Sequence, residues 1–164
     1  MGSTVRTIRE SDHEKVISVV NEWWGGRDMA WLLPRLFFQH FGDTSFAVEG
    51  DGELVGFLIG FVSQSRVGEA YIHFVGVRPD KRKEGIGRRL YELFFEEVGK
   101  RGCTKVSCIT SPVNGGSIAF HRAMGFFLKE PDTEVDGVPV HRHYDGLDRD
   151  RVVFEKTLLE VPQS

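Results

Sequence analysis

A short run that combines three charged residues with two closely spaced glycines is the first place where this sequence offers chemistry. It follows an apolar, strand-like stretch, residues 71–77, and precedes a helix that opens with Arg88. A glycine-containing turn between a strand and a helix leaves several backbone N–H groups without partners, and the helix dipole adds to their partial positive charge. The pattern therefore predicts an anion site, most naturally one for phosphate. The run consists of Arg82, Lys83, Glu84, Gly85, Ile86 and Gly87.

The spacing of these glycines separates the run from two common phosphate-binding loops. It lacks GxxxxGK[ST], which excludes the P-loop of nucleoside-triphosphate enzymes. It also lacks GxGxxG after the first strand, which disfavours a dinucleotide-binding fold. The alternative, for the run taken alone, is a plain glycine-softened turn that carries solvated charges.

A second stretch identifies the family that this sequence resembles. Residues 114–126 read NGGSIAFHRAMGF, and residues 82–87 read RKEGIG. Together they resemble two signatures of the GCN5-related N-acetyltransferases, R/Q-x-x-G-x-G/A and an asparagine followed by Y-x-x-x-G-F, in the usual order and separation. The resemblance covers nearly the whole chain. It implies an α/β fold with a mostly antiparallel central sheet and about four helices, and transfer of acetyl from acetyl-CoA to a primary amine.

The resemblance also implies where coenzyme A binds. The backbone amides of the glycine turn would hold its pyrophosphate, and the side chains of Arg82, Lys83 and Arg88 would add weaker, screened charge. The pantetheine arm would lie along the preceding strand and bond the backbone of Val75 and Val77. An N–H near Val75 would then stabilise the oxyanion of the tetrahedral intermediate.

Three residues of the second motif have expected roles at the cofactor. Asn114 matches the asparagine that contacts the pantetheine arm, although it is also a good helix N-cap, and Ser117 would face the cofactor too. His121 stands where the family usually has the tyrosine that protonates the leaving thiolate. An imidazole can donate an N–H to sulfur or deliver a proton, so the role survives with a different pH dependence. The alternative is that His121 packs or caps and that water protonates the thiolate.

The attacking amine must lose a proton, so a general base is expected as well. Strand alternation places Glu69, Tyr71, His73 and Val75 on one face. Because Val75 is expected beside the thioester, this face would look into the acceptor cleft. Glu69 or His73, acting through water, are the candidate bases. The alternatives are a solvated Glu69 at the strand end and a hydrogen-bonded His73 in the core.

Two groups of side chains are expected to surround the acceptor together with Tyr71. Trp23 and Trp24 lie on an early helix that forms a pocket wall in the family, although such aromatics are often core residues. A long, polar, turn-rich segment, residues 131–148, would act as a lid that selects the substrate. It carries His141, His143 and Tyr144. The H-x-H pattern suggests a metal site, but the family needs no metal and we expect none.

The rest of the chain supplies the elements that position these residues. Ser11 and Glu14 predict a capping box at the start of the first helix. Apolar periodicity predicts further helices at residues 32–41, after Gly87 and after Asn114. Strands are predicted at residues 5–9, 45–49, 54–62, 69–77, 105–110, 126–129 and 151–158. This order predicts one mixed sheet flanked by helices, in a single domain over residues 1–164.

Composition narrows the class of protein. The 164 residues carry a net charge of −3, which argues against a nucleic-acid partner. The sequence contains no apolar run long enough for a membrane span, and its N-terminus lacks a signal region. Cys103 and Cys108 fit no metal or redox spacing, which favours a reducing cytoplasm.

The expected activity is direct attack of a small-molecule amine on acetyl-CoA, because no cysteine is placed as an acyl carrier. A covalent role for Cys108 is the exception to exclude. Two rival functions remain. The substitution at His121 admits an acyl-CoA-binding module without turnover, and a protein or peptide acetyltransferase would need an open groove. The sequence leaves the acceptor and the oligomeric state open, a homodimer included.

Overall fold

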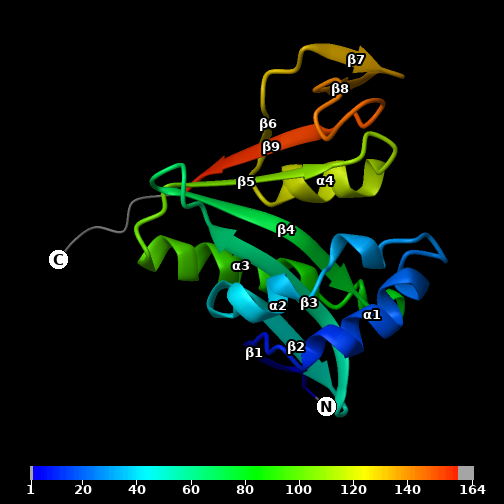
Figure 1. Ribbon diagram of the computed structural model, residues 1–164, viewed down its shortest axis with the longest axis vertical. Helices are drawn as coiled ribbons and strands as arrows, with labels where there is room; N and C mark the ends of the chain where they lie inside the picture. The colour runs from blue at the N-terminus through cyan, green and yellow to red at the C-terminus, as the bar shows by residue number, and fades with distance from the viewer. Residues whose placement is uncertain (1, 159–164) are drawn as a thin grey trace.

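A mostly antiparallel sheet forms the centre of the molecule in the computed structural model, which describes residues 2–158 (Figure 1). Its seven strands lie in the order β1-β2-β3-β4-β5-β9-β6, and only β4 and β5 pair in parallel. The mixed sheet predicted from the sequence is therefore confirmed.

Apart from residues 30–41 and an unpredicted hairpin at residues 133–140, the elements follow one another along the chain as the periodicity predicts. The α-helices are α1 (Asp12–Trp23), α2 (Leu36–His40), α3 (Ile86–Lys100) and α4 (Gly115–Ala123). The strands are β1 (Thr4–Thr7), β2 (Phe46–Gly50), β3 (Glu53–Val62), β4 (Glu69–Val77), β5 (Lys105–Thr110), β6 (Phe127–Leu128), β7 (Thr133–Val135), β8 (Val138–Val140) and β9 (Val152–Thr157). The hairpin β7–β8 stands apart from the main sheet and lies within the predicted lid.

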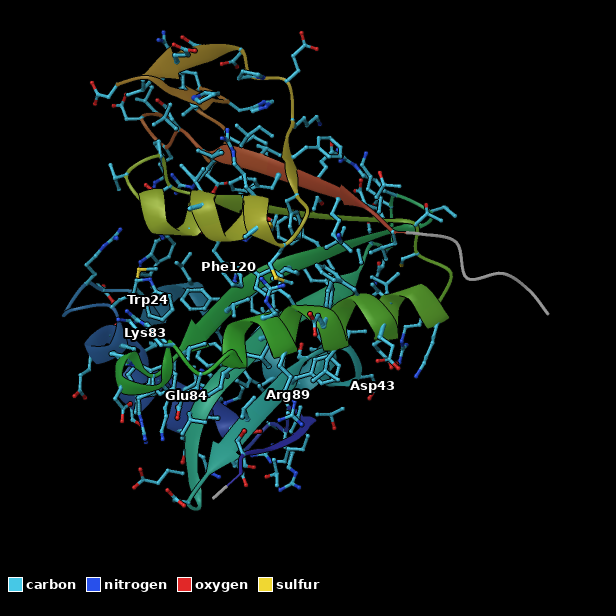
Figure 2. All side chains as sticks on the ribbon, turned by 180° about the vertical axis from the view of Figure 1, so that it is seen from behind. Trp24, Asp43, Lys83, Glu84, Arg89 and Phe120 are labelled. Atoms are coloured by element: carbon cyan, nitrogen blue, oxygen red, sulfur yellow. The ribbon has the colours of Figure 1, made fainter. Side chains whose placement is uncertain are left out.

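Helices cover both faces of the sheet. Helices α1 and α2 pack on one face, where Val16, Val20 and Phe38 meet Phe57 and Phe74 of the sheet. Helices α3 and α4 cover the opposite face, seen from behind in Figure 2. There the apolar stripe of α3 packs on the sheet through Ile86, Leu90, Phe94 and Val98.

The prediction of a helix over residues 32–41 is wrong in its extent. The structure has a 3₁₀ turn at Ala30–Leu32, and α2 begins only at Leu36. Pro34 explains the break, because proline has no N–H to donate and disfavours helical geometry in the residue before it. Residues 24–35 consequently form an irregular segment between α1 and α2 instead of a helix.

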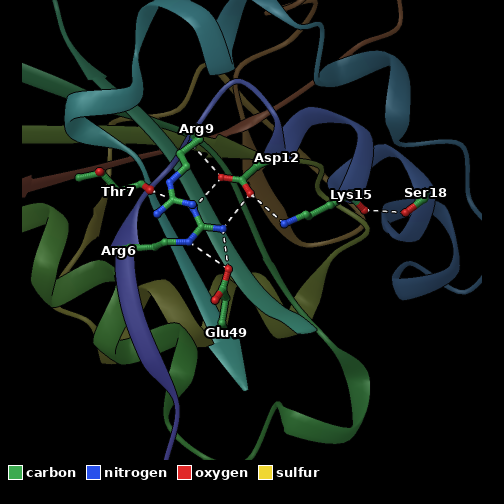
Figure 3. Close-up of polar contacts among 7 residues, drawn as sticks. All are labelled: Arg6, Thr7, Arg9, Asp12, Lys15, Ser18 and Glu49. Atoms are coloured by element: carbon green, nitrogen blue, oxygen red, sulfur yellow. Dashed lines mark hydrogen bonds and ion pairs between the residues drawn. The ribbon is translucent and has the colours of Figure 1, made fainter. Parts of the chain in front are cut away.

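A charge network anchors the start of α1 in place of the predicted capping box. Ser11 forms no side-chain cap. The Asp12 carboxylate instead accepts two hydrogen bonds of 2.8 Å from the guanidinium of Arg6 and one of 2.7 Å from the N–H of Arg9 (Figure 3). Arg6 also bonds Glu49 of β2. Burial acts to raise the pKa of Asp12, but the Arg6 and Arg9 bonds outweigh it and lower that pKa.

Strands β4 and β5 separate in the middle of the sheet. They pair only where Glu69, Ala70 and Tyr71 face Lys105, Val106 and Ser107. Beyond this point β4 stays with β3, whereas β5 stays with β9 along its full length. Figure 1 shows the two strands meeting at one end and diverging toward the other. The edge of β4 beyond Tyr71 is therefore open to a ligand.

A β-bulge at His73 changes which side chains share a face of β4. Ile59 pairs with Phe74 and Gly60 with Ile72, so His73 is the unpaired extra residue. Phe74 packs in the core under α1 and α2, whereas Val75 packs against the core under α3. The prediction that Tyr71, His73 and Val75 share one face is wrong, because one extra residue shifts the alternation.

Candidate active site

A cavity of about 590 Å³ occupies the gap between β4 and β5. Its first end is lined by side chains of β4, β5, α3 and α4: Ile72, Val75, Tyr91, Cys108, Ile109, Thr110, Ser111, Asn114, Ser117 and His121. Its second end is lined from the irregular segment, β4 and the end of the lid: Trp24, Arg27, Asp28, Met29, Trp31, Leu32, Tyr71, His73, Phe74, Asp145 and Arg151. One cavity thus joins the two faces of the sheet through its split.

The free backbone edge of β4 faces this gap. The N–H of Arg78 donates to Val55 O at 2.9 Å, and β3 and β4 pair in antiparallel register. Since alternate residues of an antiparallel pair bond the neighbouring strand, Val75 and Val77 direct their N–H and C=O groups away from β3. That is the side from which β5 has withdrawn. The geometry suits the predicted extra-strand pairing with a pantetheine arm, which stays a prediction.

The glycine turn in front of α3 has the predicted geometry of an anion site. Gly85 adopts a left-handed conformation, with φ of 77°, and α3 begins at the next residue. Figure 2 shows Lys83 and Glu84 at this end of the helix. Within residues 2–158, five backbone N–H groups around the turn have no backbone acceptor. They belong to Lys83, Gly85, Ile86, Gly87 and Arg88.

The side chain of Arg82 does not extend toward the phosphate site as predicted. Its Nε donates to Val77 O at 3.1 Å, its Nη2 donates to Trp23 O, and its guanidinium lies 5.9 Å from the Trp24 ring. Arg82 therefore holds the turn against the end of α1. Lys83 and Arg88 are exposed, and neither forms an ion pair among the residues that the structure describes.

Asn114 caps α4 and also lines the cavity. Its Oδ1 accepts the N–H of Ser117 at 3.2 Å, which confirms the capping prediction. Both residues lie on the cavity wall opposite the free edge of β4. Their contact with the pantetheine arm stays a prediction.

His121 is buried and held on both ring nitrogens. Nδ1 lies 2.7 Å from Ser117 O, and Nε2 lies 2.8 Å from the hydroxyl of Tyr91. A carbonyl oxygen only accepts, so Nδ1 carries the proton and Nε2 of the neutral ring accepts the Tyr91 O–H. The ring stacks on Phe154 with centroids 4.7 Å apart. Burial lowers the pKa of His121, although the Ser117 bond acts in the opposite direction.

Tyr91 is a cavity residue that the sequence reasoning missed. It lies on α3, is 4% exposed, and brings its hydroxyl to the imidazole that stands in the family's tyrosine position. Its burial raises the pKa of the phenol well above its ordinary value. Its place on the apolar stripe of α3 gave no signal, because an aromatic there is ordinarily a core residue.

The two candidate bases lie in different surroundings. His73 lines the cavity, stacks on Phe37 at 4.2 Å and bonds Leu32 O at 2.6 Å. Its burial lowers the pKa, while the Leu32 bond and the charge of Asp145 act to raise it. Glu69 does not line the cavity, since it lies at the closed end of the split with Lys105 and Arg66 at 3.6 Å and 3.5 Å.

The predicted pocket residues are only partly brought together. Tyr71 and Trp24 line the cavity, whereas Trp23 is 4% exposed and packs on Phe57 in the core. Both tryptophans meet the sheet, but Trp24 packs on Phe74, with ring centroids 5.0 Å apart, at a position that also lines the cavity. Three lid residues also lie outside the cavity lining: His141, His143 and Tyr144. The lid contributes Asp145 to the cavity lining instead. Arg151, the residue directly before β9, lines the cavity as well.

The two cysteines are buried free thiols. Cys108 lines the cavity and is 2% exposed. Its burial raises the pKa of the thiol far above the ordinary value, so the reactive thiolate is suppressed.

Two features of residues 2–158 bear on other classes of function. No three side chains of histidine, cysteine, aspartate or glutamate gather there in a way that would hold a metal ion. In the same range, every helix is too short or too polar to cross a bilayer.

The fold and the cavity can now be compared with known proteins. A model described as "Acetyltransferase (GNAT) family" matches residues 9–126, which is most of the chain. The chain belongs to the acetyltransferase (GNAT) family. Family membership confirms the resemblance inferred from the two motifs. It also identifies the chain as an acetyltransferase, whose co-substrate is acetyl-CoA.

GNAT relatives with named acceptors differ in what they acetylate. An L-2,4-diaminobutyric acid acetyltransferase of Nocardia farcinica is 32% identical over 89 residues, 54% of this chain and 46% of that protein. The ribosomal protein bS18-alanine N-acetyltransferase of Escherichia coli K12 is 29% identical over 82 residues, 50% of this chain and 53% of that protein. The matches thus span about half the length of these two curated relatives.

A solved GNAT structure shares the whole fold. Diaminobutyrate acetyltransferase EctA of Paenibacillus lautus, in complex with L-2,4-diaminobutyric acid and coenzyme A, superposes with a TM-score of 0.74. The alignment covers 99% of this chain and 98% of that one at 17% identity. At this identity the likeness concerns the fold alone.

Proposed function

We propose that this GNAT enzyme transfers acetyl from acetyl-CoA to a primary amine of a small molecule, by direct attack in a ternary complex. The observation that supports the proposal is the cavity through the split sheet. Its first end, toward α4, would take the donor and is called the donor slot. Its second end, toward Trp24 and Asp145, would take the acceptor and is called the acceptor chamber. Two segments meet beside the acceptor chamber: Arg149, which directly follows the lid, lies 5.3 Å from the Trp31 ring. This closure favours a small acceptor.

The donor slot follows from the turn and the free edge of β4. The unpaired amides before α3 would bind the pyrophosphate of acetyl-CoA. The backbone of Val75 and Val77 would then bond the pantetheine arm as an added strand, and Asn114 and Ser117 would contact it from α4. This placement brings the thioester to Val75, whose N–H is free to bind the developing oxyanion.

His73 is the base that fits the acceptor chamber. Its Nε2 is bonded to Leu32 O, which only accepts, so Nε2 carries the proton and Nδ1 is the basic atom of the neutral ring. The lowered pKa keeps the imidazole neutral near pH 7, as a base requires. Glu69 is less suited, because two cations hold it outside the cavity lining.

His121 and Tyr91 together supply the proton for the leaving thiolate. Neutral His121 has no N–H to spare, since Nδ1–H is bonded to Ser117 O and Nε2 accepts from Tyr91. Because burial lowers the pKa of His121, the protonated ring is the minority form near pH 7. In that form Nε2–H donates to the phenol oxygen and frees the Tyr91 O–H for sulfur. The thiolate then takes the phenol proton as the phenol takes the imidazolium proton. The overall transfer, from imidazolium to thiolate, is downhill because a thiol has a higher pKa than an imidazolium.

Direct attack fits the state of Cys108. A covalent acyl-enzyme would need a thiolate, and burial keeps this thiol protonated. One tetrahedral intermediate then suffices for the reaction: the amine adds to the thioester carbonyl and gives up its proton, and the intermediate collapses to the amide with loss of coenzyme A thiolate.

Thiol release with a panel of acceptors tests the proposal. Purified protein, acetyl-CoA and either small amines or peptides with a free N-terminus are compared by the rate of free thiol formation. Faster release with at least one small amine than with any peptide supports the proposal. Faster release with peptides would assign the enzyme to proteins, as the relative that acetylates ribosomal protein bS18 alanine does by its name. Tight coenzyme A binding without release would indicate a non-catalytic module.

A further inference from the structure

The acceptor end of the cavity contains an ion pair in which both the guanidinium and the carboxylate keep unused hydrogen-bonding atoms. Arg151 donates from Nε to Asp145 Oδ2 at 3.0 Å and from Nη1 to Asp150 O at 2.8 Å. Backbone bonds between Arg151 and His141, of 2.8 Å and 3.1 Å, fix the base of the side chain at the start of β9. The Arg151 side chain is 21% exposed and lines the cavity together with Asp145.

Neither group is saturated by this pair. A guanidinium has five N–H donors, and the described residues use two of those on Arg151. A carboxylate can accept about four hydrogen bonds, and the described residues give one to Asp145. The cavity wall therefore presents cationic donors and an anionic acceptor side by side, which matches a ligand with one carboxylate and one ammonium group.

The pair is not required to hold the lid together. Backbone bonds from Asp145 to Arg149 and from Gly146 to His143 close the turns of this segment, and the N–H of His143 bonds the Asp150 carboxylate at 2.8 Å. An ion pair between two partly exposed side chains adds little to stability on top of such bonds. A role in binding is the better explanation for its place on the cavity wall.

The charges around the acceptor chamber balance. On the opposite wall, the exposed residues Arg27 and Asp28 also carry one charge of each sign. With two charges of each sign, this end of the cavity has no net charge to attract a polyamine or a dicarboxylate, whereas a zwitterion can pair each of its two charges with an opposite one. Asp145 also lies close enough to act electrostatically on both His73 and Tyr71. An ammonium group held by Asp145 is thus near the proposed base.

We propose that the acceptor is an aminocarboxylate: Arg151 binds its carboxylate, and Asp145 holds the ammonium group until His73 removes a proton. This inference rests on the proposed acetyl transfer to a small amine. It names the class of acceptor and two residues that select it.

Matched acceptors test this inference. Each aminocarboxylate is paired with the amine that lacks only the carboxylate: glycine with methylamine, alanine with ethylamine and lysine with cadaverine. The aminocarboxylate that the wild-type enzyme acetylates fastest should have a kcat/KM about 10- to 100-fold above that of the matching amine without the carboxylate. This ratio corresponds to one charge-assisted hydrogen bond. Equal values for both members of every pair would overturn the inference while leaving the proposed function intact. No thiol release with any of the six would overturn both.

An Arg151→Met variant provides the second arm. It should remove the preference by raising KM for the aminocarboxylate much more than KM for the plain amine. Arg151→Lys should restore part of the preference. Arg142→Met is the matched control, because this exposed lid arginine does not line the cavity. Unchanged coenzyme A affinity and far-ultraviolet circular dichroism establish that the variants are folded. A preference that survives in folded Arg151→Met would contradict the assignment.

Discussion

Replacing Tyr91 by phenylalanine removes one hydroxyl from the proposed proton relay and keeps the ring. The ring's edge contacts with Phe120 and Phe126, at centroid distances of 5.1 Å and 6.1 Å, are retained. The 2.8 Å bond to His121 Nε2 is lost, which leaves a buried acceptor without a partner. Such an orphaned group costs about 1–3 kcal/mol of unfolding free energy. The loss of an acid–base group lowers turnover by roughly 10²–10⁴-fold.

The two effects are measured separately. Urea unfolding gives the loss of stability, calorimetry gives the affinity for coenzyme A, and thiol release at saturating acetyl-CoA gives kcat. Val98→Ala is a matched control, because Val98 lies on the same helix, is fully buried and does not line the cavity. We expect it to lose a similar amount of stability, about 1–3 kcal/mol for a buried truncation, and to keep wild-type kcat.

The pattern of outcomes decides the role of the pair. Tyr91→Phe should lose stability and kcat but keep its affinity for coenzyme A. The limb of its kcat/KM profile that falls as pH rises should disappear, since that limb reports the loss of the proton from His121. It lies below pH 6.5, because burial lowers the pKa of His121. A variant that is destabilised yet turns over like wild type would refute the relay and leave Tyr91 as a core residue. Wild-type stability would show that the hydrogen bond contributes nothing.

The other predictions concern the cofactor turn, the base, the thiol and the metal. Gly85→Asp should abolish coenzyme A binding, because its φ of 77° strains an L-residue by about 1–2 kcal/mol and the new carboxylate repels phosphate, whereas Gly52→Asp, with φ of 78° in the β2–β3 hairpin, should bind normally. His73→Gln keeps a donor for Leu32 O but should lose the acidic limb of the profile, which lies below pH 6.5 because burial lowers this pKa; a retained limb would exclude His73 as the base. Cys108→Ala should retain turnover, and its loss would overturn direct attack. Chelators should leave activity unchanged, and inhibition would revive a metal site at His141 and His143.

Local motifs were readable because their chemistry is local. The left-handed Gly85 and the cap formed by Asn114 depend on residues within one turn of the chain. The parts that depend on distant partners were not readable. The bulge at His73 arises from its pairing with β3, and the inward turn of Arg82 depends on carbonyl groups of α1 and β4.

The acceptor chamber was the least predictable region for the same reason. Which of Trp23 and Trp24 lines the cavity is set by the rotation of α1, which two adjacent apolar residues do not define. The lid pattern drew attention to His141 and His143, but the turn geometry places Asp145 on the cavity wall instead. Tyr91 reaches His121 only because α3 and α4 pack side by side on one face of the sheet.

Following a labelled acetyl group tests the central claim most directly. Acetyl-CoA labelled in its acetyl group is incubated with the protein and the acceptor panel, and the label is quantified in the amine and in the intact protein. The account predicts one labelled amine for each thiol released and no label retained on the protein. Label accumulating on the protein would contradict direct attack, and tight coenzyme A binding without label in any amine would contradict acetyl transfer itself.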